Sequence, residues 1–302
     1  MKTKPTETSP QSRDSEQSGE KPWTIRSVLQ WTTDFFAQHD LESARLDAEV
    51  LLAHVLEQER LALYLYYEDK VPRSALQAYR QLIRRRVNRE PVAYITGTRE
   101  FYSISFAVEP SVLIPRPETE HLVEFVLEHV KERAGTAGEE ALRLLEIGTG
   151  SGNLCITLAS NIPQAQILSL DVSLSAIAVA RKNLTGHPDC SERVRLVQGD
   201  LLESLHPERA RFHLILSNPP YVAAECWDEL APEVREYEPR TALDGGHRGT
   251  EILHRILHEA ARFLLPEGAL VLEIGEDQAE AMACAAEETG HYRQWRVLED
   301  YA

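Results

Sequence analysis

The stretch LLEIGTGSGN, residues 144–153, decides the fold class that the sequence predicts. An apolar run ends in three alternating glycines, Gly148, Gly150 and Gly152, and a second apolar run follows at residues 154–159. Glycines permit a tight turn and let the backbone approach a ligand without an intervening Cβ atom. We therefore expect a buried strand, a ligand-binding turn and a helix, which together make the first unit of an open α/β sheet.

Apolar runs of strand length recur around this turn, and segments of helical character connect most of them. This alternation is typical of a doubly wound, mainly parallel sheet, so the predicted fold class is α/β and Rossmann-like. The predicted strands are 142–147, 166–170, 194–198, 212–217 and 269–274.

Acidic residues follow two of these strands. The dinucleotide fingerprint G-x-G-x-x-G would need a glycine at position 153, where this chain has Asn153, so the turn departs from a pyrophosphate cradle. Asp171 lies about 20 residues beyond the turn, where an acidic side chain accepts hydrogen bonds from ribose hydroxyls. Asp200 follows the third strand and can receive an adenine amino group. The set indicates a ribose-and-adenine pocket with little provision for phosphate, which S-adenosylmethionine fits and NAD does not.

The stretch SNPPYV, residues 217–222, follows the fourth predicted strand directly. Pro219 and Pro220 fix φ and donate no backbone hydrogen bond, so they end the strand abruptly and hold the neighbouring carbonyl groups in fixed directions. One interpretation is a strand that ends in a stiff turn, with Tyr221 as a packing residue. The other is a preformed polar clamp made with Asn218 at the carboxyl end of the sheet, where open α/β folds bind ligands.

The whole chain divides into four predicted segments. Residues 1–22 are polar and charged and are expected to be a disordered tail, and residues 23–90 have the apolar periodicity of a helical bundle. Residues 91–115 alternate in the manner of a β-hairpin linker, and 116–302 form the α/β domain. An arginine run in the bundle is interpreted as a solvated helix face or as a contact surface for a partner; it comprises Arg80, Arg84, Arg85, Arg86 and Arg89.

Composition restricts the possible partners. Residues 1–115 carry 15 basic and 16 acidic groups, whereas residues 116–302 carry 17 and 32. An acidic second half is a poor partner for a phosphate backbone, so a nucleic-acid substrate is disfavoured. The four cysteines are scattered, no metal site is predicted, and no apolar run approaches the ~20 residues of a membrane helix. We expect a cytoplasmic protein with reduced thiols.

Two further motifs make a family resemblance specific. The glycine turn with its acidic residues resembles the class I S-adenosylmethionine-dependent methyltransferases, and NPPY, residues 218–221, resembles the signature of their amino-nitrogen branch. TGTREFY, residues 96–102, and LIPRPETE, residues 113–120, are similar to segments of the HemK/PrmC family of release factor glutamine methyltransferases. The resemblance runs from about residue 23 to the end of the chain.

The resemblance implies methylation of N5 of the glutamine in the Gly-Gly-Gln motif of class I peptide-chain release factors, with S-adenosylmethionine as cofactor. It implies that the N-terminal bundle grips the release factor. It also implies cofactor contacts by the turn Gly148, Thr149, Gly150, Ser151 and Gly152 and by Asp171, Asp200, Leu201 and Asn218. The substrate amide would be held by Asn218, Pro219, Pro220 and Tyr221, with Phe101 nearby.

Several alternatives remain open. Phe101 can equally pack within the hairpin, and Arg116 and Glu118 can order the site or pair on the surface. Relatives normally continue past residues 298–301 into a final strand, so a strand at 295–298 is expected to lack a neighbour. NPPY also serves adenine-N6 methylation of DNA or RNA, which would need a basic groove. A non-catalytic docking module would have no need of the intact pocket residues.

Overall fold

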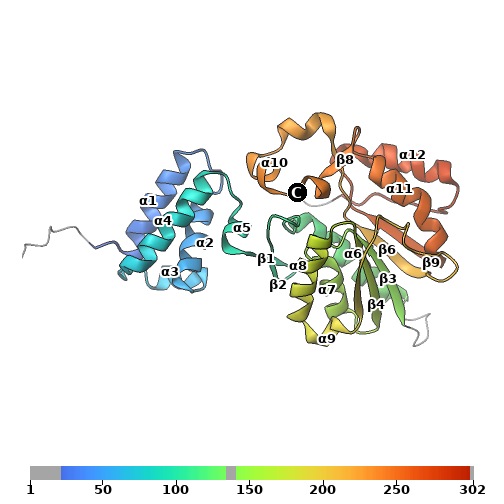
Figure 1. The fold of residues 1–302 in the computed structure, drawn as a ribbon, viewed down its shortest axis with the longest axis horizontal. Coiled ribbons are helices and arrows are strands. Elements are labelled where there is room, and N and C mark those ends of the chain that lie inside the picture. The colour runs from blue at the N-terminus through green and yellow to red at the C-terminus, as the bar shows by residue number, and fades with distance from the viewer. Residues whose placement is uncertain (1–21, 134–140, 300–302) are drawn as a thin grey trace, which may run out of the picture. The chain divides into compact units, whose positions relative to one another are not determined.

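The computed structural model describes residues 22–133 and 141–299 and divides the chain into two compact units, residues 1–83 and 84–302 (Figure 1). The predicted disordered tail lies outside the described residues except for Pro22. The boundary between the units falls inside helix α4 (Arg73–Val87).

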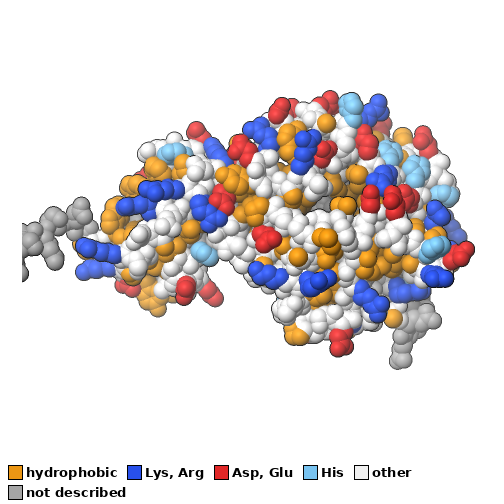
Figure 2. Space-filling model, viewed as in Figure 1, with side chains coloured by type: hydrophobic (Ala, Val, Ile, Leu, Met, Phe, Trp, Pro, Cys, Tyr) orange, Lys and Arg blue, Asp and Glu red, His pale blue; other side chains and the backbone are white. Residues whose placement is uncertain are grey.

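The N-terminal unit is helical. Its helices are α1 (Ile25–Ala37), α2 (Ala44–Leu56), α3 (Arg60–Leu65) and the first part of α4. Thr24 begins α1 with a capping box, in which its hydroxyl accepts from the Ser27 N–H and the Ser27 hydroxyl accepts from the Thr24 N–H. Phe36 and Leu51 are fully buried, and the Tyr79 hydroxyl donates to the Ala48 carbonyl at 2.9 Å. Large apolar side chains nevertheless reach the surface of this unit (Figure 2), among them Trp23, Trp31, Leu61, Leu65 and Tyr66.

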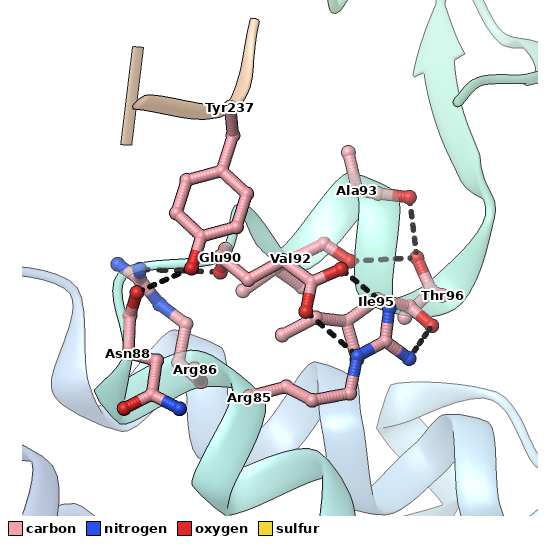
Figure 3. Close-up of polar contacts among 9 residues, drawn as sticks. All are labelled: Arg85, Arg86, Asn88, Glu90, Val92, Ala93, Ile95, Thr96 and Tyr237. Atoms are coloured by element: carbon pink, nitrogen blue, oxygen red, sulfur yellow. Dashed lines mark hydrogen bonds and ion pairs between the residues drawn. The ribbon is translucent and has the colours of Figure 1, made fainter. Parts of the chain in front are cut away.

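Arginines at the end of α4 form ion pairs, and Figure 3 shows the one between Arg85 and Glu90. Arg85 holds both carboxylate oxygens of Glu90 at 2.5 and 2.7 Å and contacts the Ile95 carbonyl. Arg86 is buried and pairs with Glu233 at 3.0 Å, and Arg89 pairs with the same carboxylate at 3.5 Å. Three members of the arginine run therefore make contacts within the chain. The prediction of a solvated face is wrong for Arg86, which is buried, whereas the side chains of Arg85 and Arg89 stay partly exposed.

The segment predicted as a hairpin begins with a helix instead. Residues Val92–Thr96 form α5, which ends at Gly97 with φ of 76°. The hairpin itself consists of β1 (Thr98–Phe101) and β2 (Ile104–Ala107), paired antiparallel. Tyr102 and Ser103 both have positive φ, 50° and 61°, as a two-residue hairpin turn that follows the strand twist requires.

The second unit is built on a five-stranded sheet of order β5-β4-β3-β6-β9, and every neighbouring pair in it is parallel. Its strands are β3 (Leu142–Ile147), β4 (Ala165–Asp171), β5 (Val194–Gln198), β6 (Phe212–Ser217) and β9 (Leu264–Leu272). The predicted parallel α/β sheet is thus confirmed, although β9 begins earlier than expected. The strand predicted at 295–298 is wrong, because residues 294–299 have no regular secondary structure.

Helices cover both faces of this sheet (Figure 1). Alternating side chains separate the two cores: Leu144 packs with α6 and α7 on one face, and Leu145 packs with α11 on the other. The helices are α6 (Glu120–Arg133), α7 (Asn153–Asn161), α8 (Leu174–Thr185), α9 (Pro188–Ser191), α10 (Pro232–Tyr237), α11 (Glu251–Ala260) and α12 (Ala279–Thr289).

Short elements complete the unit. The two-residue strand β7 (Val222–Ala223) follows the proline turn and pairs in parallel with β8 (Asp244–Gly246). The 3₁₀ turns are η1 (Pro117–Thr119), η2 (Ala224–Glu229), η3 (Arg240–Ala242), η4 (Ala261–Phe263) and η5 (Glu276–Gln278). Across the described ranges, no helix combines the length and apolar character that crossing a membrane demands.

Candidate active site

The glycine turn joins the carboxyl end of β3 to α7. Gly148, Gly150 and Gly152 all have positive φ, 88°, 52° and 83°, so each needs the conformational freedom of glycine. The Gly148 and Thr149 N–H groups both donate to the Leu170 carbonyl, at 2.8 and 3.0 Å, which holds the turn against the end of β4. The turn is therefore fixed in a conformation that leaves open space beside Gly150, where a Cβ atom would meet nothing within 4 Å.

Asp171 ends β4 beside this turn. One carboxylate oxygen accepts from the Gly150 N–H at 2.9 Å, and the other accepts from the Ser173 N–H at 2.8 Å. Burial raises the pKa of Asp171, and the two backbone hydrogen bonds lower it. Each carboxylate oxygen can accept more than one hydrogen bond, so Asp171 retains capacity for the hydroxyl groups of a ligand.

A second carboxyl group is buried beneath the turn. The Ser169 hydroxyl donates to Glu146 and also hydrogen-bonds the Thr149 hydroxyl at 2.6 Å. Glu146 is 1% exposed, and burial raises its pKa to about 8. Among the described residues, its second carboxylate oxygen has no hydrogen-bond partner. Glu146 therefore favours the protonated form, because burial penalises its charge more than the neighbouring hydrogen bonds stabilise it.

The turn after β5 supplies the third predicted acidic residue. The Gly199 N–H donates to the Asp171 carbonyl at 2.9 Å, which places Asp200 and Leu201 at the same edge of the sheet. Leu201 has a φ of 46°, and both residues line the cavity that the glycine turn borders. Asp200 is exposed and one of its oxygens lies 3.3 Å from the Arg255 guanidinium, so an adenine amino group would share this carboxylate with an arginine.

The proline turn lies directly beside the glycine turn. The Ser217 hydroxyl donates to the Ile147 carbonyl at 2.6 Å, and a Cβ atom on Gly148 would lie 3.5 Å from the Asn218 carbonyl oxygen. Asn218, Pro219 and Pro220 line the same cavity as Gly148, Gly150, Ser151 and Asp171. Two motifs about 70 residues apart in the sequence thus form one site, as the meeting of parallel strand ends predicts.

Tyr221 and Phe101 are not among the residues that line this cavity. Tyr221 packs beside the core that α11 and α12 share, and its carbonyl accepts from the Gln278 amide at 2.8 Å. Phe101 is 1% exposed and packs edge-to-face with Phe106, with ring centroids 6.3 Å apart. Contact of either side chain with a substrate therefore stays a prediction.

Arg116 pairs inside the unit rather than with Glu118. Its guanidinium lies 2.5 Å from Glu238, a buried carboxylate that also accepts from the Ile114 N–H at 3.1 Å. Tyr237 next to it donates to the Asn88 carbonyl, as Figure 3 shows. The segment from α10 to η3 is held by these contacts, and Thr241 and Ala242 at its end line the cavity.

Two residues next to Asn218 were not predicted from the sequence: Thr119, which contacts its side chain, and Glu273, which contacts Thr119. The Asn218 amide donates to the Thr119 hydroxyl at 2.9 Å, and that hydroxyl donates to Glu273 at 2.7 Å. Thr119 belongs to the LIPRPETE motif, and Glu273 directly follows β9. The strand-end position of Glu273 was the available signal, because the carboxyl ends of β3 and β4 had already supplied site residues.

Comparison with known proteins identifies matches along most of the chain. Residues 27–97 match the PrmC N-terminal domain, and residues 121–232 match the Methyltransferase small domain. A release factor glutamine methyltransferase of Rhodopirellula baltica is 42% identical over 288 residues, covering 95% of this chain and 96% of that protein. One of Geobacter sulfurreducens is 42% identical over 273 residues, covering 90% and 92%.

A solved structure supports the fold. The hMettl16 catalytic domain, in complex with MAT2A 3'UTR hairpin 1, matches with a TM-score of 0.51 over 68% of this chain and 72% of that chain. The sequence identity is 16%, so the likeness extends to the methyltransferase fold alone.

Proposed function

We propose, from the premise that this chain belongs to the release factor glutamine methyltransferase family, that it uses S-adenosylmethionine to methylate N5 of a release factor glutamine. The glutamine would be that of the Gly-Gly-Gln motif of class I release factors. The observation that carries the proposal is that three residues of the glycine turn, Gly148, Gly150 and Ser151, line a single cavity with Asp171 and the turn at Asn218. A cofactor and a substrate amide can therefore meet there.

The residues present fit S-adenosylmethionine. The open space beside Gly150 suits a close approach of the methionine part to the backbone, and Asp171 keeps acceptor capacity for ribose hydroxyls. Leu201 offers an apolar border for the adenine, and Asp200 a hydrogen-bond acceptor. When bound, the cofactor supplies a methyl group on a positively charged sulfur.

The turn at Asn218 suits the amide that receives the methyl group. An amide nitrogen is a weak nucleophile because its lone pair is delocalised into the carbonyl. The side-chain oxygen of Asn218 and the backbone carbonyl of Pro219 can each accept one N–H of the substrate amide, which fixes the direction of its nitrogen. This assigns catalysis to positioning and electrostatics, and no residue is needed as a general base before transfer.

The proposal is tested by comparing acceptors. Wild-type protein is incubated with labelled S-adenosylmethionine and, separately, with unmethylated release factor, DNA and RNA, with Asn218→Ala as the matched variant. We expect label in the release factor alone, and a loss of at least roughly 100-fold in Asn218→Ala with little change in cofactor affinity. Preferred labelling of nucleic acid would favour the adenine-N6 alternative, and full activity of the variant would refute the clamp.

The acidic balance of residues 116–302 favours a protein substrate over a nucleic acid. These residues carry 17 basic and 32 acidic groups, and on the face in Figure 2 both signs are interspersed. A nucleic-acid methyltransferase draws most of its affinity from clustered basic side chains. We expect the protein to act in the cytoplasm, where translation terminates.

We assign release factor recognition to the N-terminal helical unit. Leu61 and Leu65 on α3 are 69% and 72% exposed, and Tyr66 next to them is 51% exposed. Leu61 and Leu65 are four residues apart in α3 and so share a face of the helix, and adjacent exposed apolar side chains are typical of contact surfaces. Replacing both leucines by serine is expected to raise KM for intact release factor several-fold and leave KM for a short Gly-Gly-Gln peptide unchanged. Equal effects on the two substrates would contradict this assignment.

A further inference from the structure

The side-chain amide of Asn218 has a donor end and an acceptor end, and only one of them suits the proposed reaction. Its oxygen can accept an N–H of the substrate amide, whereas its NH₂ group would face that N–H donor against donor. A rotation of 180° about the last side-chain bond exchanges the two ends with little change in shape. Some other part of the protein must therefore determine which end faces the substrate.

Two residues from distant parts of the chain meet Asn218. Thr119 ends the 3₁₀ turn η1 and is 2% exposed, and its hydroxyl oxygen lies 2.9 Å from the Asn218 amide nitrogen. The same hydroxyl lies 2.7 Å from a carboxylate oxygen of Glu273. The sheet fixes Glu273 in place, because its N–H donates to the Ser217 carbonyl at 3.0 Å, one residue before Asn218.

When Glu273 is ionised, the hydrogen bonds that link Asn218, Thr119 and Glu273 can run in only one direction. A carboxylate only accepts, so the single proton of the Thr119 hydroxyl must point to Glu273. The hydroxyl oxygen can then only accept a hydrogen bond from Asn218, so the NH₂ group of Asn218 must be the donor. The oxygen of the Asn218 amide is left for another donor.

We propose that Thr119 and Glu273 are positioning residues that orient the Asn218 amide with its oxygen toward the substrate. The consequence for catalysis rests on the proposed function, whereas the orientation itself does not depend on which substrate binds. A hydroxyl relay to a carboxylate gives the amide a defined direction that the proline turn by itself does not provide.

The charge environment makes this orientation sensitive to pH. Burial raises the pKa of Glu273 to about 7, and the neighbouring Glu118 raises it further. The Thr119 hydrogen bond, Arg116 and the Asn218 amide lower it. Arg116 is itself paired with Glu238 at 2.5 Å. Glu273 therefore takes up a proton within the pH range in which the protein can be assayed.

Protonation removes the direction of the relay. A protonated Glu273 can donate to the Thr119 hydroxyl, whose own proton is then free to turn toward Asn218. The amide can rotate and present its NH₂ group to the substrate. The rate of methyl transfer should therefore fall as the pH is lowered through about 7, the pKa of Glu273.

The kinetic test uses shape-conserving variants. Thr119→Val removes the hydroxyl, Thr119→Ser keeps it, and Glu273→Gln removes the titration. The matched control is Thr157→Val in α7, because Thr157 is also buried and its hydroxyl has no hydrogen-bond partner among the described residues. We expect kcat to fall roughly 10- to 100-fold in Thr119→Val and to be largely retained in Thr119→Ser and Thr157→Val.

Two further readouts separate positioning from general damage. Affinity for S-adenosylmethionine, measured by calorimetry, should change less than about 3-fold in every variant, because the hydrogen bonds of the Thr119 hydroxyl join Glu273 and Asn218 rather than the glycine turn. The decline of kcat below pH 7 should be lost in Glu273→Gln, with a lower but flatter profile. An unaltered profile in Glu273→Gln, or equal losses in Thr119→Val and Thr157→Val, would overturn the proposal.

A spectroscopic test does not depend on the reaction. The side-chain NH₂ signals of Asn218 are assigned by their absence in Asn218→Ala and followed by NMR as the pH changes. They should titrate with a midpoint near the pKa of Glu273, about 7, and this titration should vanish in Glu273→Gln. If the chemical shifts of the Asn218 NH₂ signals change neither with pH nor in Thr119→Val, the proposed orientation is wrong. If these signals titrate as expected but release factor is not methylated, only the proposed function is contradicted.

Discussion

Asn183 on α8 joins the hairpin to the glycine turn, and its replacement by leucine gives the sharpest test of how the site is held. The side chain is 8% exposed, accepts from the Ala107 N–H at 2.8 Å and donates to the Ala107 carbonyl at 3.0 Å. It also donates to the Ser151 carbonyl at 2.8 Å. Asn183→Leu keeps the approximate shape of the side chain and removes all three hydrogen bonds.

The expected loss follows from these three bonds. A net contribution of about 1 kcal/mol for each gives roughly 3 kcal/mol, and more if a buried carbonyl stays unpaired. With a urea m-value of about 2–3 kcal/mol/M, the unfolding midpoint should fall by about 1 M. Hydrogen exchange pulses at increasing urea, read by mass spectrometry on peptides of β3, β4 and α8, report this unit separately from the N-terminal helices.

Asn161→Leu is the matched control for this substitution. Asn161 is exposed and donates one hydrogen bond, to the Thr157 carbonyl of its own helix at 2.9 Å. Its loss should cost at most about 1 kcal/mol and shift the midpoint by less than about 0.5 M. Equal midpoints for the two variants would refute the claim that Asn183 is a structural link between the hairpin and the site.

Three further substitutions test separate parts of the account. Asp171→Asn should weaken S-adenosylmethionine binding by roughly 30- to 100-fold in calorimetry, because an NH₂ group would then face a backbone donor; unchanged affinity would contradict its role. Burial holds the pKa of Glu146 at about 8 rather than its ordinary 4.5, so its stabilising effect is lost as the pH rises from about 5 to 8. Glu146→Gln should remove this part of the fall in unfolding free energy, and an identical pH dependence in both proteins would contradict it. Arg86→Met should lower the unfolding free energy by about 2–3 kcal/mol because it leaves the Glu233 carboxylate without its 3.0 Å partner, whereas Arg80→Met at an exposed position of the same helix should change little; equal effects would show that the ion pair is unimportant.

The strands of the central sheet could be predicted because their burial requires apolar residues, which are visible in the sequence. Central parallel strands are covered on both faces, so their segments are mostly apolar, as at residues 142–147 and 212–217, where four of the six residues are apolar. The apolar pattern of residues 295–298 predicted a strand that does not form, because these residues are not buried. Trp295 and Leu298 are 49% and 59% exposed, so their side chains gain little from burial, and a strand needs a partner that periodicity cannot supply.

The site could be predicted as far as chain order determines it. Parallel strands bring their carboxyl ends to one edge, so the glycine turn, Asp171 and the turn at Asn218 had to lie near each other. The Thr119 hydroxyl and Glu273 are 154 positions apart in the sequence, and no local pattern relates them. The contact between Asp200 and Arg255 is a competing ion pair of the same long-range kind. Long-range polar contacts depend on side-chain geometry, which only the folded structure defines.

The central claim is that this cavity transfers a methyl group to a release factor glutamine, and mass spectrometry of the product tests it most directly. Unmethylated release factor is incubated with the protein and labelled S-adenosylmethionine, digested and fragmented. The account predicts a single added methyl group, placed by the fragments on the side-chain amide of the Gly-Gly-Gln glutamine. Label at another residue, or no label from protein that binds S-adenosylmethionine in calorimetry, would contradict it.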